Sequence, residues 1–172
     1  MNELYAADPA VCKSALELKL LFSSFGPYVG RYLANYPNDW IGRVELGMSS
    51  AHDIEIARIQ TLLRRAKENL ILVTKTNLQW NSDQEWLSNA AALLNGSEPV
   101  FKGLIAQSPN LPAIYSLHDV DLPPTAEERV KGVAAEYVRI SKILLLLSQE
   151  IAFIDPYLNP CKRNCAPVLK AL

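Results

Sequence analysis

Few side chains in this sequence could perform acid–base or nucleophilic chemistry. The chain has only two histidines among its 172 residues, and one of them, His118, lies in a polar loop beside Asp119 and Asp121. Asp155 directly follows the apolar run 151–154, and the carboxyl ends of buried strands are where α/β sheets place their sites. A carboxylate there can hold a cation, orient a histidine or accept a proton. These four residues form one candidate catalytic site, of the type that a phosphodiesterase or nuclease with a divalent cation would use.

Asp155 also has a purely structural interpretation. It precedes Pro156, and an aspartate in such a turn commonly bonds its own backbone or caps the next helix. The candidate site requires Asp155 and His118 to meet in space, within about 4–6 Å, which their spacing in the sequence does not establish. The catalytic and the structural interpretation are therefore both kept as hypotheses.

Other kinds of site are excluded or disfavoured by the motifs. The seven glycines form neither a dinucleotide-binding nor a phosphate-loop pattern, and no Gly-x-Ser-x-Gly elbow is present. Cys161 and Cys165 would lie one turn apart on a helix and could serve as two metal ligands or as a redox pair. No second pair completes a four-ligand zinc site, so a structural or incidental role is favoured, and no metal or cofactor is expected.

The composition indicates a folded cytoplasmic protein without a general affinity for nucleic acid. Hydrophobic residues make up 49% of the chain and the formal net charge is −1, which argues against a protein that coats nucleic acid. A nucleic-acid or phosphodiester ligand at a local site has no support from composition. Three cysteines, an odd number, are poor material for a secreted disulfide framework. The sequence starts without a signal-peptide pattern, and its most apolar stretch, 143–147, is too short to span a membrane.

The first 69 residues are predicted to be helical. Asp8 fits an N-cap and Pro9 a first helical position, and the apolar spacing that follows predicts a helix up to Phe25. Aromatic residues then recur every four positions and predict two short helices, 27–35 and 38–47; these residues are Tyr28, Tyr32, Tyr36 and Trp40. Such a row could stack on nucleic-acid bases, although half-buried core packing is favoured.

Further along the chain, predicted strands alternate with capped helices. Ser50 with Asp53 forms a capping pattern for a helix to about Asn69, and Ser82 with Glu85 forms another for a helix that ends at 95–96. The predicted strands and the long helix are listed in chain order: strand 70–76, strand 100–105, strand 113–117, helix 125–148 and strand 151–154. Nearby prolines make 100–105 an edge strand or no strand.

This alternation predicts an α/β protein, helix-rich, with a small and mostly parallel sheet, flanking helices and an N-terminal helical region. We expect one domain over 1–172, helical over 1–69 and α/β over 70–172. The long helix also carries a 3–4–3–4 apolar rhythm that fits a coiled-coil seam.

One segment resembles a known family. The run Ile-Ala-Phe-Ile-Asp-Pro-Tyr-Leu at 151–158, followed by 164–172, resembles the opening strand and helix of phospholipase D-like domains, in particular the subset with an Asp-Pro-Tyr strand. The preceding chain, including the segment Trp-Leu-Ser-Asn-Ala at 86–90, is similar to the N-terminal part of uncharacterised bacterial proteins that carry such a domain.

The family's catalytic motif is not matched. The resemblance implies a His-x-Lys motif whose histidine attacks phosphorus and whose lysine binds the phosphate charge. Here His52 is followed by Asp53-Ile54, and His118 by Asp119-Val120. The sequence also stops one helix after the diagnostic strand. The resemblance therefore implies an incomplete phospholipase D-like protein, possessing no complete active site in these residues.

Three hypotheses of function follow. The first is a non-catalytic module that acts by binding, alone or as part of a larger protein. The second is a metal-assisted phosphodiesterase or nuclease that uses Asp155 and His118. The third is a helical protein that dimerises through the seam of 125–148. The first and third predict that the C-terminal helix or the long helix covers its apolar side with a second copy or a partner protein.

Overall fold

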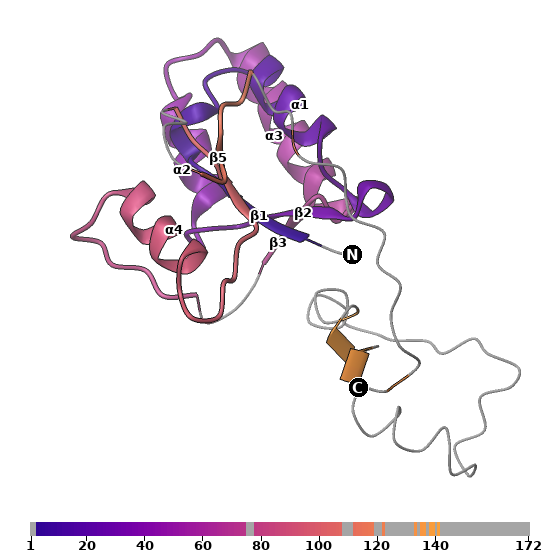
Figure 1. Cartoon of the computed structure of the whole chain (residues 1–172). Helices are drawn as coiled ribbons and strands as arrows, with labels where there is room; N and C mark the ends of the chain where they lie inside the picture. Colours follow the sequence, from indigo (N-terminus) through magenta and orange to yellow (C-terminus); the bar gives the residue numbers. More distant parts are fainter. Residues whose placement is uncertain are drawn as a thin grey trace, which may run out of the picture. The chain divides into compact units, whose positions relative to one another are not determined.

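The computed structural model describes residues 3–74, 78–107, 112–118 and 122, and six positions between 133 and 141. Contacts within the chain divide it into two units, Glu3–Thr125 and, separately, Met1–Asn2 with Ala126–Leu172. The sheet and the labelled helices all belong to the first unit (Figure 1). In the second unit, Arg139 donates two hydrogen bonds to Glu136 Oε2, of 2.9 and 3.1 Å.

Within the described residues, five short strands form one parallel sheet. The strands are β1 (Glu3–Ala7), β2 (Arg31–Ala34), β3 (Leu72–Val73), β4 (Gly103–Ile105) and β5 (Ile114–Tyr115). Their order is β3-β2-β1-β4-β5, and each neighbouring pair is parallel. In chain order, β2 and β3 are added on one side of β1, and β4 and β5 are then added on the other side. The switch point of the sheet therefore lies between β1 and β4, where open α/β sheets place their ligand sites.

Helices cover both faces of this sheet (Figure 1). The helices are α1 (Ala15–Ser23), α2 (Trp40–Gly47), α3 (Asp53–Glu68) and α4 (Trp86–Leu94), with 3-10 turns η1 (Pro9–Val11) and η2 (Pro27–Val29). The helices α1, α2 and α3 connect β1 to β2 and β2 to β3, and they pack on one face. Helix α4 lies between β3 and β4 in the chain and packs on the other.

The main core lies between the sheet and α1, α2 and α3. Tyr5, Leu33 and Leu72 are neighbours across three strands, so their side chains share one face, and all three are buried. The helix residues packed on them include Leu18, Leu21, Phe22, Trp40, Val44, Ile59, Leu63 and Ala66. On α3 the buried positions recur at four and three residues, which puts them on one side of the helix.

The predicted α/β fold with a small parallel sheet and flanking helices is confirmed. The predictions for α3, α4 and β3 are right in position, because each depends on a local pattern. The predicted caps are not used: α3 and α4 follow His52 and Glu85, and neither side chain makes a capping bond.

The prediction that residues 1–69 are helical is wrong in two places. Both β1 and β2 lie within this range. The predicted helix 27–35 is the turn η2 followed by β2, and Gly30 between them has a left-handed φ of 65°, which ends helical structure there. An aromatic spacing of four fits one side of a strand as well as one face of a helix, because four is a multiple of the strand period.

Two further predictions need correction. The predicted continuous helix from Pro9 to Phe25 is divided into η1 and α1. Asp8 does cap η1, as its carboxylate accepts from Ala10 N at 2.9 Å. The strand predicted as an edge strand or no strand at 100–105 is instead the interior strand β4, paired with both β1 and β5. Its three residues contain no proline, so no ladder donor is lost.

The predicted strand 151–154, the C-terminal helix 164–172 and most of the predicted helix 125–148 lie outside the described residues. Among the residues that the structure describes, no helix is both long enough and apolar enough to cross a membrane.

Candidate functional site at the carboxyl edge of the sheet

A small pocket lies at the carboxyl ends of β1, β4 and β5, at the switch point of the sheet. We call it the switch-point pocket. It has a volume of about 140 Å³ and is lined by Val11, Lys13, Glu17, Ala106, Gln107, Ser116, Leu117 and His118. These residues come from the segments that follow three adjacent strands and from the first turn of α1. The pocket therefore exists only because the topology places β1 between β2 and β4 and β5 beside β4.

Hydrogen bonds hold the walls of this pocket together. Asp8 N donates to Ile105 O at 2.9 Å, which continues the β1–β4 pairing one residue past the strand. Gln107 Nε2 donates to Ala10 O at 2.9 Å and ties the segment after β4 to η1. On the third side, His118 N donates to Ser116 Oγ at 3.4 Å. The loops around the pocket are thus positioned by the strands and by each other.

Three backbone amides at the amino end of α1 are occupied and do not offer the phosphate site of dinucleotide-binding folds. In those folds the pyrophosphate accepts from the free amides of the helix that follows β1. Here Ala15 N donates to Glu55 Oε1 at 2.8 Å, and Glu17 N donates to Ser14 Oγ at 3.2 Å. Lys13 N donates to Glu17 Oε2 at 2.7 Å. Since side chains of the protein already accept from these three amides, the arrangement argues against the dinucleotide mode at this position.

The polar side chains that line the pocket combine one ammonium group with groups that both donate and accept hydrogen bonds. The ammonium of Lys13 and the imidazole of His118 are exposed, and within the described part of the chain neither side chain has a hydrogen bond or an ion pair. Ser116 adds a hydroxyl group, and Glu17 adds one carboxylate. This set suits a small oxyanion that carries a single negative charge, because the ammonium attracts it and the carboxylate opposes a second charge.

Burial disfavours the charged forms of Asp8 and Cys12, two residues in the segment that follows β1. Burial raises the pKa of Asp8, although the hydrogen bond from Ala10 N partly lowers it. Burial also raises the pKa of the Cys12 thiol well above its usual range, and the carboxylates of Glu17 and Asp8 add to this effect. A thiol that stays protonated is a poor nucleophile. Cys12 is therefore a packing residue and not a reactive one.

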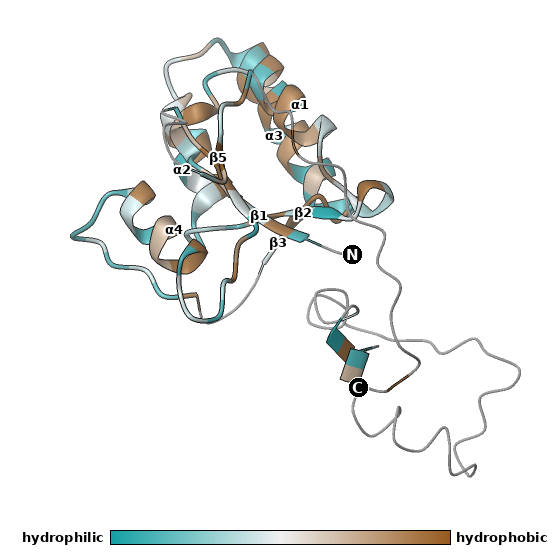
Figure 2. Cartoon of the chain, in the orientation of Figure 1, coloured by the Kyte–Doolittle hydropathy of each residue, from teal (hydrophilic) through white to brown (hydrophobic). Residues whose placement is uncertain are grey.

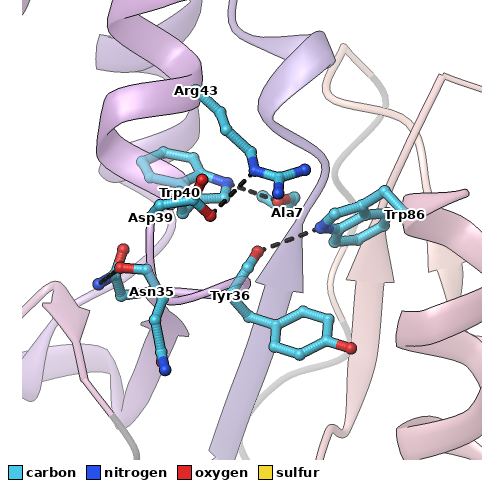
Figure 3. A network of polar contacts seen from close by, with 8 residues as sticks. Ala7, Asn35, Tyr36, Asp39, Trp40, Arg43 and Trp86 are labelled. Atoms are coloured by element: carbon cyan, nitrogen blue, oxygen red, sulfur yellow. Dashed lines mark hydrogen bonds and ion pairs between the residues drawn. The ribbon is translucent and has the colours of Figure 1, made fainter. Parts of the chain in front are cut away.

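Two tryptophan side chains, one on each face of the sheet, donate hydrogen bonds to backbone carbonyls near the carboxyl ends of β1 and β2 (Figure 3). Trp40 Nε1 on α2 donates to Ala7 O at 2.6 Å, and Trp86 Nε1 on α4 donates to Tyr36 O at 3.1 Å. Both rings are buried, so each bond satisfies an indole and a carbonyl that would otherwise be costly to bury. These bonds connect α2 and α4 to the edge of the sheet beside the switch-point pocket.

Polar residues continue along the same edge next to β2 (Figure 3). Arg43 Nε donates to Asp39 Oδ1 at 2.9 Å, and its guanidinium lies 4.7 Å from the ring centroid of Trp80. Asn35 Nδ2 donates to Asn38 O at 2.8 Å, whereas the buried Asn35 Oδ1 accepts no hydrogen bond. The arginine is thus used by a carboxylate and a ring.

Of the site residues predicted from the sequence, His118 lines the switch-point pocket. Asp119, Asp121 and Asp155 lie outside the described residues, so the predicted meeting of His118 with Asp155 stays a prediction. Cys161 and Cys165 also lie outside them. Among the described residues, no group of three or more His, Cys, Asp or Glu side chains is placed to hold a metal ion.

The sequence analysis missed the other pocket residues, Lys13, Glu17, Gln107 and Ser116. One signal could have indicated the location: the run Leu-Tyr-Ala-Ala at 4–7 is followed by Asp8-Pro9, the same dipeptide that follows the apolar run 151–154. Treating Asp8 as a residue after a strand would have placed β1 and the segment after it at the carboxyl edge. The comparisons with known proteins add no further residue, since no protein-family model, curated protein or solved structure matches this chain.

Proposed function

We propose that the chain is a binding module, the incomplete phospholipase D-like protein inferred from its sequence, and that the switch-point pocket holds a phosphodiester group. The observation that supports this proposal is that Lys13 and His118 line one pocket. They lie far apart in the sequence and form no His-x-Lys motif. The pocket nevertheless contains the two side-chain types by which phospholipase D-like enzymes engage a phosphate, without the family's arrangement for attack on phosphorus.

The size and charge of the pocket favour a phosphodiester over larger or more highly charged ligands. A volume of about 140 Å³ holds four or five water molecules at about 30 Å³ each, which is enough for one phosphoryl group and a few attached atoms. A phosphomonoester would bring a second negative charge toward Glu17. Its repulsion by that carboxylate makes the singly charged diester the better ligand.

The two histidines allow a direct test of this proposal. The chain contains only His52 and His118, so a histidine-selective NMR spectrum gives one signal from the pocket and one internal control. Titration with dimethyl phosphate at constant pH should shift the His118 signal and leave His52 in place. Lys13→Ala should weaken binding at least fivefold, because it removes the charge that attracts the anion, whereas Lys102→Ala, an exposed lysine next to the opposite end of β4, should not.

Two results would contradict the proposal. The first is a His118 signal that does not move at any concentration of dimethyl phosphate. The second is an equal loss of affinity in Lys13→Ala and Lys102→Ala, because binding would then reflect the general charge of the protein and not the pocket.

The location of His118 at the carboxyl edge also favours the second hypothesis, a metal-assisted phosphodiesterase that uses His118 and Asp155. That enzyme would hydrolyse bis(p-nitrophenyl) phosphate when Mg²⁺ or Mn²⁺ is added. The activity would disappear in His118→Ala and in Asp155→Ala and persist in His52→Ala. Binding of dimethyl phosphate without such hydrolysis supports the binding module instead.

A further inference from the structure

A large apolar groove lies between α1 and α3, away from the switch-point pocket. We call it the α1–α3 groove. It has a volume of about 710 Å³ and is lined by Ala15, Leu16, Lys19, Ile54, Glu55, Ala57, Arg58, Thr61, Leu62 and Arg65. The two helices run beside each other in Figure 1, and Figure 2 colours α1 mainly as apolar and α3 as alternately apolar and hydrophilic.

Large apolar side chains on this side of the molecule are left in water. Leu16 is 76% exposed and Ile54 is 69% exposed, and Leu20, one turn after Leu16 on α1, is 41% exposed. Single exposed apolar residues are normal on a protein surface, but Leu16 and Ile54 line the same groove, and such a group indicates an interaction site. The described residues therefore form an exposed apolar surface at the α1–α3 groove.

The charges around the groove favour an acidic occupant. Lys19, Arg58 and Arg65 line it, against one carboxylate, Glu55. Glu55 is already in use: its Oε1 accepts from Ala15 N at 2.8 Å, and its Oε2 lies 3.8 Å from Arg58. Within the described part of the chain, Lys19 and Arg65 have no ion pair. The rim is thus positively charged and complementary to acidic side chains.

The same charges argue against a second copy of this chain as the occupant. A symmetric dimer through this groove would bring the same surface of both copies together. Lys19, Arg58 and Arg65 of one copy would then face the cations of the other, and juxtaposed like charges disfavour an interface.

The length of the groove along α3 fits a helix. On α3 the lining residues run from Ile54 to Arg65, eleven steps of ~1.5 Å or about 16 Å, which corresponds to roughly three helical turns. An apolar groove between two helices is a common docking site for an amphipathic helix, whose anchors recur at three and four residues. We propose that the α1–α3 groove binds an amphipathic helix of a partner protein, with its apolar stripe in the groove and acidic residues beside that stripe.

Designed peptides and the full chain can test this proposal. Two fluorescently labelled helical peptides would share one stripe of leucines at spacings of three and four, flanked by glutamate in one and by lysine in the other. Fluorescence anisotropy should give at least tenfold tighter binding for the glutamate peptide. Ile54→Glu should weaken this binding at least tenfold, and Leu46→Glu, an equally exposed leucine on α2 (74%), should not change it.

Charge reversals test the rim separately. Arg65→Glu should abolish the preference for the glutamate peptide. Lys67→Glu, an exposed position on the other side of the same helix, should preserve it. All four substituted residues are exposed, so unchanged urea unfolding would show that lost binding reflects the groove and not the fold.

Several results would overturn the proposal. Equal affinity for the two peptides would rule out a preference for an acidic partner. Full affinity of the Ile54→Glu protein for the glutamate peptide would rule out the groove as the binding site. Self-association in sedimentation that is lost in Ile54→Glu would identify a second copy as the occupant. Binding to vesicles of phosphatidylcholine and phosphatidylserine that is lost in the same variant would identify a lipid surface instead.

Discussion

Gly103 leaves no room for a side chain in the middle of the sheet. A Cβ atom at this position of β4 would lie 2.7 Å from Tyr115 Cε2, 3.0 Å from Tyr5 Cε1 and 3.1 Å from Ala113 O. The Tyr5 ring is held in place by its hydroxyl, which donates to Glu3 Oε2 at 2.9 Å, and the Ala113 carbonyl accepts from Leu104 N in the β4–β5 ladder. The Gly103→Ala protein must therefore move the half-buried Tyr115 ring.

The expected cost follows from these distances. Carbon atoms attract each other best at about 3.5–4.0 Å, so the closest contact is too short by roughly 1 Å. Overpacking of this kind typically costs ~1–3 kcal/mol. Replacing glycine by alanine in a strand also gives back ~0.5–1 kcal/mol of conformational entropy. We therefore expect Gly103→Ala to lower the free energy of unfolding by about 1–2 kcal/mol, a substantial part of the ~5–15 kcal/mol of a typical domain.

Urea unfolding followed by tryptophan fluorescence would measure this change. The matched control is Gly42→Ala in the exposed part of α2, where an added Cβ would meet nothing within 4 Å. That substitution should raise the free energy of unfolding by ~0.5–1 kcal/mol, since alanine is the better helix former. The same chemical change is therefore expected to have opposite signs at the two positions.

A double substitution identifies the clash. In a Tyr115→Ala background the closest contact is gone, so Gly103→Ala should cost less than in the native background, although Tyr5 and Ala113 remain close. A neutral or stabilising Gly103→Ala would refute the packing argument. An unchanged cost in the Tyr115→Ala background would refute the assignment of Tyr115 as the group that must move.

Two predictions concern buried titratable groups. Burial raises the pKa of Asp8 above its ordinary value of 3.8, so the native state keeps this proton to a higher pH than the unfolded chain does. The contribution of Asp8 to stability therefore falls as the pH rises from the ordinary pKa through the raised one. Urea unfolding from pH 3 to pH 7 should show that Asp8→Asn loses less stability than the native protein across this window, and an equal loss in the two proteins would contradict the prediction. The Cys12 thiol is buried and its pKa is raised mainly by burial, so iodoacetamide should modify it at least a hundredfold more slowly in the native protein than in urea. Peptide mapping distinguishes the modification of Cys12 from that of Cys161 and Cys165. Fast labelling of Cys12 in the native protein would contradict the prediction, because it would show that the thiol is accessible.

The helices could be predicted from the sequence because their signal is local. On α3, Ile59, Leu63 and Ala66 are buried and recur at the helical period, and this pattern is complete within the segment itself. The apolar, branched run around β3 was likewise sufficient to indicate a strand buried in a parallel sheet.

The strands β1 and β2 could not be predicted in the same way. Each has five residues or fewer, and the spacing between Tyr32 and Tyr36 fits either period. Pairing decides between the two structures: β2 is hydrogen-bonded to β1 on one side and to β3 on the other, and both partners lie far away in the sequence. A segment of this length adopts the conformation that its neighbours stabilise.

The residues of the candidate site show the same difference between local sequence patterns and contacts that depend on distant segments. Local patterns are enough to indicate that His118 lies in a polar loop near the end of a strand, that no glycine-rich phosphate motif exists, and that the helices have apolar sides. That Lys13, Glu17 and Gln107 join His118 in one pocket follows from the folded structure, because this requires β1, β4 and β5 to lie side by side with their carboxyl ends at one edge. Residue types are set by the sequence alone, whereas their proximity depends on strand order, which arises from hydrogen bonds between distant segments.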